Sequence, residues 1–408
     1  MVRTSTQRPA STTTSQPLSG IRVVDLTRIY SGPYCTFLMA LAGAEVIKVE
    51  TPEGEHLRHR NARGGAGLPF AMLNANKRLV TVDYKQPEGR ALLMRLIATA
   101  DVLVENFRPG VMNALGLDRD SVRAVNPRLI YASTSGFGEE GPYRDLAAMD
   151  LTIQALSGAI ATTGFPDGTP VKTGPAFGDF SAGIHLYAAI VTALLHRERT
   201  GEALSPEISM LESMYTSLCS NLGAAMSGKE QRPSRTGNRH GGLSMCPYNV
   251  YPTTDGQIAI ICSNDRHWDK LTAALGRPDL GEDLRLKTME GRVAHMDFVD
   301  SQIAGETAKQ GKDALFALLS KSGVPCGPVR DLPEVMADPQ LRHTGMLKEV
   351  NHPEYGSLVL PHTPLRYRGE PRADYVPSGR LGADNETIWT SLGVDAEEFA
   401  RLREAGII

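Results

Sequence analysis

The hydrophobic positions in the first third of the chain form short apolar runs separated by longer mixed stretches. The short runs predict buried strands, and the stretches between them predict helices. The expected strands are 21–25, 44–49, 79–82, 102–104 and 129–133, and the expected helices are 33–41, 87–99 and 111–114. Because strands that alternate with helices form parallel sheets with right-handed crossovers, we expect a doubly wound, Rossmann-like α/β domain.

The pattern changes after residue 141, where longer apolar stretches follow one another. Between 227 and 242 the chain turns polar and glycine-rich, which indicates a linker or loop. The expected elements are buried helices at 149–160, 181–195 and 208–222, a hairpin at 250–262, and helices at 267–274, 312–321 and 396–405. The hairpin and the helices that follow it predict a second, smaller α+β domain.

Composition narrows the class of protein. The length of 408 residues favours two domains, and the net charge of -3 gives no reason to expect nucleic acid or an anionic membrane as a partner. No apolar run reaches about 18 residues, so no membrane-spanning helix is expected. Residues 1–17 predict a disordered tail, with a transit peptide as the alternative. The five cysteines contain no CxxC pair, so we expect no metal site and no disulfide framework, and a cytoplasmic location fits.

The segment 174–183 (GPAFGDFSAG) carries one carboxylate, Asp179, among small residues, and a long apolar stretch follows it. A carboxylate with no second carboxylate close in sequence, at the start of a buried helix, is a candidate nucleophile rather than half of an acid/base pair. The alternative is that Asp179 only caps that helix.

Several segments resemble, in the same order, those of a known enzyme family. They are 26–33 (LTRIYSGP), 74–78 (NANKR), 101–110 (DVLVENFRPG), 126–131 (NPRLIY), 178–179 (GD), 199–201 (RTG), 237–238 (GN) and 323–329 (GVPCGPV). Over residues 18–408 the chain is similar to the class III coenzyme A transferases, which include the formyl-CoA:oxalate, carnitine and bile-acid CoA-transferases.

The resemblance implies an interlocked homodimer of two ring-like chains. Each chain would have a doubly wound large domain and a smaller α+β domain inserted late in the sequence. The expected parts are a disordered tail at 1–18, the first part of the large domain at 19–226, a linker and the small domain at 227–340, and a C-terminal segment at 341–408 that returns to the large domain.

The resemblance also implies the chemistry. Asp179 matches the family's catalytic aspartate, which attacks an acyl-CoA thioester and passes through a mixed anhydride and an aspartyl-CoA thioester. The implied partners are an acyl-CoA and a free carboxylic acid of small dicarboxylate type. Coenzyme A is a substrate in this reaction, so no cofactor is expected.

The resemblance places the CoA contacts on loops of the large domain. They are Tyr30 and Ser31 near the thiol end, Lys85, Asn106, Phe107 and Arg108 on the nucleotide side, and Ser135, Gly136 and Phe137 beside the pantetheine arm. Gly241 and Gly242, after His240, match a glycine-rich substrate loop over the site. Thr51 and Ala114 stand where a relative carries arginines. Candidates to replace these phosphate contacts are the pairs Arg58/Arg60 and Lys85/Arg108.

Three other functions remain as alternatives. In the related α-methylacyl-CoA racemases a histidine precedes the aspartate that matches Asp150, and it shares proton transfer with the aspartate at 179. Met149 cannot titrate, which disfavours a racemase. A nicotinamide-dependent oxidoreductase needs GxGxxG after the first strand, and residues 28–33 read RIYSGP. A non-catalytic acyl-CoA-binding protein is disfavoured by the presence of Asp179.

Overall fold

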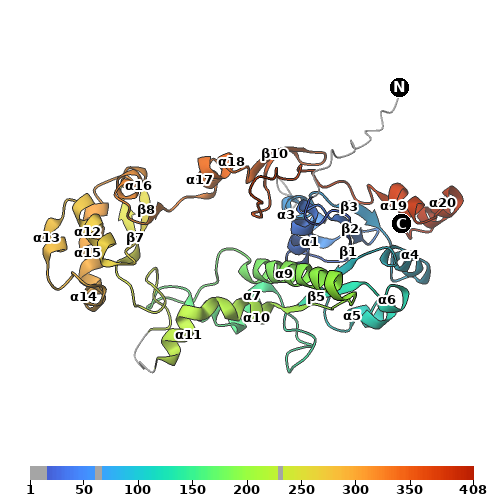
Figure 1. Cartoon of the computed structure of the whole chain (residues 1–408), viewed down its shortest axis with the longest axis horizontal. Helices are drawn as coiled ribbons and strands as arrows, with labels where there is room; N and C mark the ends of the chain where they lie inside the picture. The colour runs from blue at the N-terminus through green and yellow to red at the C-terminus, as the bar shows by residue number, and fades with distance from the viewer. Residues whose placement is uncertain (1–15, 60–66, 228–232) are drawn as a thin grey trace. The chain divides into compact units, whose positions relative to one another are not determined.

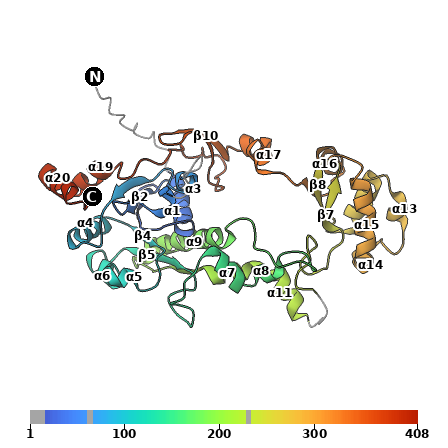
Figure 2. The same ribbon diagram turned by 180° about the vertical axis from the view of Figure 1, so that it is seen from behind.

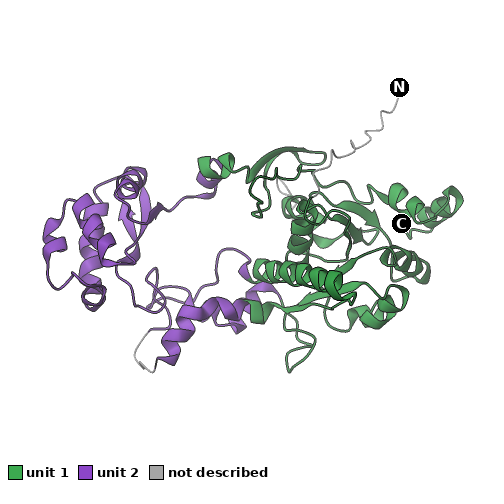
Figure 3. Ribbon diagram, viewed as in Figure 1, with its two compact units in different colours: residues 1–148, 178–213, 339–408 green, residues 149–177, 214–338 purple. Residues whose placement is uncertain are grey.

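The structure is a computed structural model that describes residues 16–59, 67–227 and 233–408. The chain folds into two compact units (Figure 3). Unit 1 takes the residues up to 148, 178–213 and 339–408, and unit 2 takes 149–177 and 214–338. The C-terminal segment therefore belongs to the same unit as the N-terminal strands.

The unit bounds differ from the expected domains in two segments. Residues 149–177 and 214–226 were assigned to the large domain from sequence, but they lie in unit 2. Neither segment contributes a residue to the two main hydrophobic cores of unit 1. Hydrophobicity alone did not show that these segments lie outside the cores of unit 1.

A six-stranded parallel sheet forms the centre of unit 1 (Figure 1). The strand order is β3-β2-β1-β4-β5-β6. The strands are β1 (Arg22–Asp25), β2 (Glu45–Glu50), β3 (Arg78–Thr81), β4 (Val102–Glu105), β5 (Ile130–Ser135) and β6 (Glu207–Ser209). In the central register Val24 lies opposite Ile47 on one side and Leu103 on the other. The predicted α/β class and parallel sheet are confirmed.

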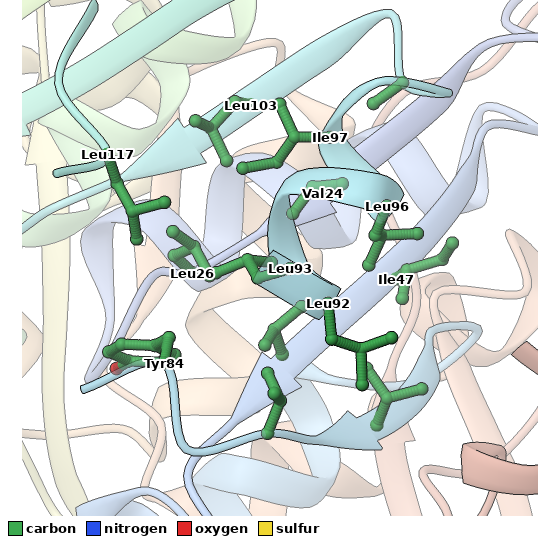
Figure 4. Close-up of a cluster of buried hydrophobic side chains, with 14 of the residues drawn as sticks. Val24, Leu26, Ile47, Tyr84, Leu92, Leu93, Leu96, Ile97, Leu103 and Leu117 are labelled. Atoms are coloured by element: carbon green, nitrogen blue, oxygen red, sulfur yellow. The ribbon is translucent and has the colours of Figure 1, made fainter. Parts of the chain in front are cut away.

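Helices cover both faces of this sheet, seen from the front in Figure 1 and from behind in Figure 2. The helices of unit 1 are α1 (Ser31–Leu41), α2 (His56–His59), α3 (Leu68–Leu73), α4 (Pro87–Ile97), α5 (Val111–Ala114), α6 (Arg119–Val125), α9 (Phe177–Thr200), α18 (Pro339–His343), α19 (Asn385–Ser391) and α20 (Ala396–Glu404), and α10 (Met210–Tyr215) begins in it. Val24 and Ile47 pack with Leu93 of α4 in one core (Figure 4). Val23 and Val46, which point the opposite way because side chains alternate along a strand, pack with α1 and α9 in the other.

The C-terminal segment covers the outer edge of the sheet. It contains the antiparallel hairpin β10 (Leu347–His352) and β11 (Gly356–Pro361), followed by α19 and α20. Asp384 accepts a hydrogen bond from the backbone N–H of Leu79 (2.8 Å), and Asn385 accepts one from that of Thr81 (2.7 Å). Side chains thereby satisfy donors of the edge strand β3, which would otherwise be open to pairing. Trp389 of α19 is fully buried in the same core as α4.

Unit 2 contains a three-stranded antiparallel sheet in the order β7-β8-β9, and Trp268 lies in a core formed by this sheet and the helices α12 to α16. The strands are β7 (Tyr248–Thr253), β8 (Gly256–Ile261) and β9 (Cys326–Pro328). The helices are α7 (Asp150–Leu156), α8 (Ala159–Thr162), α11 (Cys219–Met226), α12 (Asp265–Ala274), α13 (Pro278–Glu282), α14 (Met289–Ala294), α15 (Met296–Thr307), α16 (Lys312–Lys321) and α17 (Leu332–Met336), with a 3₁₀ turn at Thr216–Leu218. The predicted hairpin at 250–262 is confirmed.

Two of the predicted long helices are wrong. The stretch 149–160 is interrupted at Gly158, whose φ of 93° is the left-handed conformation typical of the residue after a helix end. It therefore forms α7 and α8, and Leu151 and Leu156 are exposed. The stretch 208–222 begins as part of β6, because Ser133 to Ser135 of β5 supply backbone partners there, and helix begins only at Met210.

Helix α9 is longer than the predicted 181–195. Among the described residues, α9 is one helix that is long and apolar enough to cross a membrane. Its mean hydropathy is 1.4 over an 18-residue window. This differs from the expectation that no stretch would reach that length. A core helix passes the same test, and Leu186 and Ile190 of α9 lie in a core of unit 1.

Replacing the buried tryptophan of the C-terminal segment, Trp389→Ala, should lower the free energy of unfolding of unit 1 by roughly 3–5 kcal/mol, because it leaves a large cavity in the core. Denaturant unfolding followed by circular dichroism measures this change. In this variant Trp268 is the remaining tryptophan, and its fluorescence reports on unit 2. The denaturant midpoint measured by this fluorescence should not change. If the unfolding of unit 1 measured by circular dichroism did not change, this would contradict a structural role of the C-terminal segment in unit 1.

Candidate active site

The carboxyl ends of β1 and β4 mark the switch point of the sheet, because the chain leaves these adjacent strands toward opposite edges. Open α/β sheets bind ligands in the crevice outside the carboxyl ends of their strands at such a point. Asp25 and Glu105 are the last residues of β1 and β4. The loops 26–30 and 106–110 follow them and contain four of the predicted CoA contacts.

Asp179 lies in the first turn of α9 and is 9% exposed. Gly183, one turn later, lies on the same buried face of the helix, because residues four apart are neighbours. A Cβ atom on Gly183 would stand 2.5 Å from the carbonyl oxygen of Ser31, so α9 approaches this turn backbone to backbone. The ring of Phe180 packs against Tyr34, with ring centroids 4.7 Å apart. Asp179 is therefore carried by a helix turn docked on the start of α1.

The loop after β1 is held through its backbone by polar side chains. The backbone N–H of Thr27 donates to Asp25 (2.9 Å), and the ammonium group of Lys48 donates to the Thr27 carbonyl. Asn106 binds both peptide groups of Arg28: its Oδ1 accepts from the N–H (2.7 Å) and its Nδ2 donates to the carbonyl (2.8 Å). The loop therefore has a defined path between two strands and the helix α1.

A buried ion pair lies beneath this loop. The ammonium group of Lys77 is 2.9 Å from Asp25 and also donates to Thr36 (2.8 Å), to Asn74 (3.0 Å) and to the carbonyl of Pro33 (3.1 Å). Burial alone would raise the pKa of Asp25, but the neighbouring lysine ammoniums and threonine hydroxyls lower it to about 2. Burial lowers the pKa of Lys77 to about 8, against the opposing effect of Asp25. The pair fixes the first turn of α1 to the end of β1.

The structure brings part of the predicted CoA set together at the switch point. Tyr30 is half-buried beside Phe180, with ring centroids 6.2 Å apart, and Ser31 is buried as the first residue of α1. The guanidinium of Arg28 lies 4.9 Å from the ring centroid of Phe107 and donates to the hydroxyl of Tyr84 (2.6 Å). The loops after β1, β3 and β4 are thereby linked.

The remaining predicted contacts of unit 1 lie on neighbouring loops. Lys85 is exposed in the turn after β3. Ser135 ends β5 and accepts from the backbone N–H of Gly138 (2.9 Å), the Gly136 carbonyl accepts from Leu211 (3.1 Å), and Phe137 packs edge-on against Tyr143. These residues follow the carboxyl ends of β3 and β5, on either side of the switch point.

Arg58, one of the candidates to replace the missing phosphate contacts, is already paired with a carboxylate of its own unit. Its guanidinium makes two hydrogen bonds to the buried carboxylate of Glu50 (2.7 and 2.9 Å) and lies 3.9 Å from the Phe70 ring centroid. This pairing disfavours Arg58 as a phosphate contact, and that role stays a prediction. Arg60 lies outside the described residues. Arg108 is exposed and lines a cavity of about 230 Å³ together with Arg119 and Arg144.

Gly241 and Gly242 lie in unit 2, as do Met149 and Asp150. The backbone N–H of Leu243 donates to the carbonyl of His240 (2.8 Å), so residues 240–243 form a hydrogen-bonded turn. The role of this turn as a substrate loop stays a prediction.

Glu105 is a buried carboxyl group at the centre of the switch point. It accepts hydrogen bonds from the backbone N–H of Phe107 (2.7 Å) and from the hydroxyl of Tyr131 (3.3 Å). Burial raises its pKa to about 7, more than these hydrogen bonds lower it. The group therefore titrates near neutral pH beneath a predicted CoA loop.

Sequence reasoning missed the side chains that hold the loops. Lys77 and Asn74 could have been identified from the sequence, because both lie in the NANKR segment that carries the resemblance. Nothing in the sequence shows that Glu55 and Lys48 turn inward. Within residues 16–59, 67–227 and 233–408 there is no group of three or more His, Cys, Asp or Glu that could hold a metal ion.

Comparison with known proteins identifies the family. The sequence profile of CoA-transferase family III matches residues 18–385. A succinate–glutarate CoA-transferase of Agrobacterium fabrum is 36% identical over 92% of this chain and 96% of its own length. A formyl-CoA:oxalate CoA-transferase of Streptomyces coelicolor is 34% identical over 97% of this chain and 100% of its own. The crystal structure of a CAIB/BAIF family protein from Brucella suis superposes with a TM-score of 0.81, at 36% identity over 92% of this chain and 99% of that chain.

The chain belongs to CoA-transferase family III. It is an enzyme of the class III CoA-transferases, as the resemblance implied.

Removing the buried ammonium group, Lys77→Met, should lower the free energy of unfolding of unit 1 by about 3–5 kcal/mol, because it leaves Asp25 buried without its nearest counter-charge. The matched control is Lys309→Met, which removes an exposed lysine paired with Glu306 and should change stability by less than about 0.5 kcal/mol. Urea unfolding measures both. Equal effects of the two substitutions would contradict the role of the buried pair.

The raised pKa of Glu105 predicts a pH dependence of stability. The folded state binds its proton more tightly than the unfolded state, so the free energy of unfolding should fall by up to about 3 kcal/mol between roughly pH 5 and pH 8. In Glu105→Gln this contribution should vanish and the curve should be flatter. Urea unfolding of both proteins across this range measures the difference, and parallel curves would show that Glu105 is not the group responsible.

Proposed function

We propose that this enzyme transfers coenzyme A from an acyl-CoA thioester to a free carboxylic acid through covalent intermediates on Asp179. The observation that carries the proposal is the place of this carboxylate. It is buried in the first turn of a long helix that docks on the loop at the switch point. The amino-terminal end of a helix favours negative charge, and burial limits competition from water.

The first half-reaction would produce an aspartyl-CoA thioester. A carboxylate oxygen of Asp179 attacks the thioester carbonyl, the C–S bond breaks, and a mixed anhydride and CoA thiolate result. The thiolate then attacks the Asp179 carbonyl carbon of the anhydride. The donor acid leaves as a carboxylate that carries one oxygen of Asp179, and CoA remains bound to the enzyme as a thioester.

The second half-reaction reverses these steps with the acceptor. The acceptor carboxylate attacks the aspartyl thioester, which releases the thiolate and forms a second anhydride. The thiolate attacks the acceptor acyl carbon, and Asp179 is regenerated with one oxygen taken from the acceptor acid. Each tetrahedral intermediate needs hydrogen-bond donors for its oxygen, and backbone amides of the loops beside Asp179 are candidates.

We further propose a small dicarboxylate as the acid substrate. The names of the relatives support this proposal, since they include transferases for glutarate, oxalate and D-citramalate. These acids carry two carboxylates each, which points to a cationic or amide contact for the distal one. Succinyl-CoA is the proposed donor class, because two of these relatives are named for succinate or succinyl-CoA.

For CoA we propose binding along the carboxyl ends of β1, β3, β4 and β5. Tyr30 and Ser31 would lie near the thiol end, and Ser135, Gly136 and Phe137 beside the pantetheine arm. Lys85, Phe107 and Arg108 would lie on the nucleotide side, beside a cavity lined by Arg108, by Arg144 and by Arg119, which is paired with Glu139 (3.0 Å). Gly241 and Gly242 would form the substrate loop.

We also propose that the protein is a homodimer, interlocked as the family resemblance implies. Large apolar side chains on α9 are exposed in the single chain, with Ile184 at 50% and Leu195 at 49%, and Leu151 and Leu156 of α7 are exposed as well. An exposed apolar stripe on a helix indicates a protein contact. A cytoplasmic location stays a prediction.

A racemase of the related kind remains the competing function. Met149 precedes the first residue of α7, and no base replaces the histidine that such racemases carry at this position. Asp150 accepts a hydrogen bond from Gln154 (2.7 Å), which fits a structural role. Epimerisation of a 2-methylacyl-CoA without an acceptor acid would support the racemase instead.

An isotope experiment tests the role of Asp179. An acceptor acid with labelled carboxylate oxygens, incubated with enzyme and succinyl-CoA, should place one labelled oxygen in the side chain of Asp179 per turnover. Mass spectrometry of the peptide that contains residue 179 measures this label. Transfer that proceeds without labelling of this peptide would overturn the covalent role.

Substitution gives a second readout. Asp179→Asn should lower the transfer rate by at least about 1,000-fold and abolish the covalent adduct seen by intact mass. The control is Asp313→Asn, which changes an exposed aspartate in the first turn of α16 and should leave the rate unaltered. Retained transfer in Asp179→Asn would contradict the proposal.

A further inference from the structure

The loop between β1 and α1 contains a residue in an unfavourable conformation. Ile29 has a φ of 67°, in the left-handed region that β-branched residues rarely adopt. Left to itself, an isoleucine would return to a negative φ and carry the following residues, Tyr30 and Ser31, with it. Residues held in such conformations persist only where surrounding groups force them, and they occur often at functional sites.

Three side chains from three different segments bind the backbone of this strained residue and of the two residues before it. Lys48 of β2 donates to the carbonyl of Thr27, Asn106 after β4 binds the N–H and the carbonyl of Arg28, and Glu55 accepts from the N–H of Ile29 (3.3 Å). They bind four backbone groups of three consecutive residues. The loop is therefore held by groups from β2, from the segment after β2 and from the loop after β4.

Glu55 is itself fixed by charged neighbours. It is buried, its ammonium neighbour Lys48 is 3.9 Å away, and its own backbone N–H donates to Glu50 (3.0 Å). Glu50 in turn receives both hydrogen bonds of Arg58. The backbone of Glu55 is thereby tied to Glu50, and its buried carboxylate connects Ile29 to the segment after β2.

The restrained loop leads directly to the turn on which α9 docks. The carbonyl of Ser31 is the atom that Gly183 approaches, and Tyr30 packs beside Phe180, the residue after Asp179. A shift of the loop would therefore shift the surface that places the first turn of α9. Misplacement of a reacting group by about 1 Å can cost a factor of about 100 in rate.

We propose that Asn106 and Glu55 are positioning residues for the transfer reaction. They hold Ile29 in its left-handed conformation, so that Tyr30 and Ser31 meet the turn of Asp179 in one arrangement. The inference rests on the proposed function of Asp179. It also gives Asn106 a role different from the predicted CoA contact, because both ends of its amide are bound to the peptide groups of Arg28.

The test compares Asn106→Ala, Ile29→Gly and the double variant. Asn106→Ala should lower kcat by about 10- to 100-fold with little change in KM for acyl-CoA. Ile29→Gly should change kcat little, because glycine adopts a positive φ without strain. In the double variant most of the lost kcat should return, since the loop is no longer driven out of its conformation. The matched control is Asn126→Ala, whose amide binds the carbonyls of Ile97 and Ala100 away from the site and whose loss should leave kcat unchanged.

Hydrogen exchange gives a readout that does not need activity. Asn106→Ala should speed amide exchange in the peptides that cover 26–31 and 177–183, and Asn126→Ala should not. A rise in KM for acyl-CoA with unchanged kcat and exchange would show that Asn106 is a CoA contact and overturn the proposal. Effects of Asn106→Ala and Ile29→Gly that simply add would overturn it too. If Asp179 fails the isotope experiment while exchange and kcat respond as expected, the proposed nucleophile is wrong and the positioning role stands.

Discussion

The ion pair between Lys77 and Asp25 is the interaction on which the arrangement of the site depends. Both groups are fully buried, and two charges removed from water are tolerated only when their hydrogen bonds are satisfied. The acceptors around Lys77 come from the end of β1, the first turn of α1 and the segment before β3. One ammonium group thus fixes three separate segments, and the loop that carries Tyr30 and Ser31 begins and ends on them.

The helix turn that carries the proposed nucleophile, Asp179, and the loop before α1 are matched in shape. Gly183 permits a backbone approach that any side chain would block, and it places Asp179 one turn away against the start of α1. The proposed reaction, in which this carboxylate attacks a thioester and is then attacked itself, requires such a fixed and dry position.

The regular part of the fold was predictable because its signals are local. The predicted strands 21–25, 44–49, 79–82, 102–104 and 129–133 coincide with β1 to β5, because each contains a short apolar run of the kind that buried parallel strands require. Asp179 was found because it interrupts a run of small residues before an apolar helix. The break at Gly158 and the strand at Glu207–Ser209 were missed, since a tertiary partner or a backbone angle decides them. Lys77 and Asp25 are 52 residues apart, and Asn385 and Thr81 are 304 apart, so no sequence window contains both members of either pair.

The return of the chain to its first unit has a consequence for biosynthesis. The ribosome makes the six strands of the central sheet, and then most of unit 2, before it makes the segment that covers β3. Until residues 339–408 emerge, the donors of β3 and the pocket for Trp389 stay open on the nascent protein. Parallel sheets also fold slowly, because their contacts are distant in sequence. The half-made enzyme therefore exposes an aggregation-prone edge during synthesis, and this is the stage at which a chaperone would be needed.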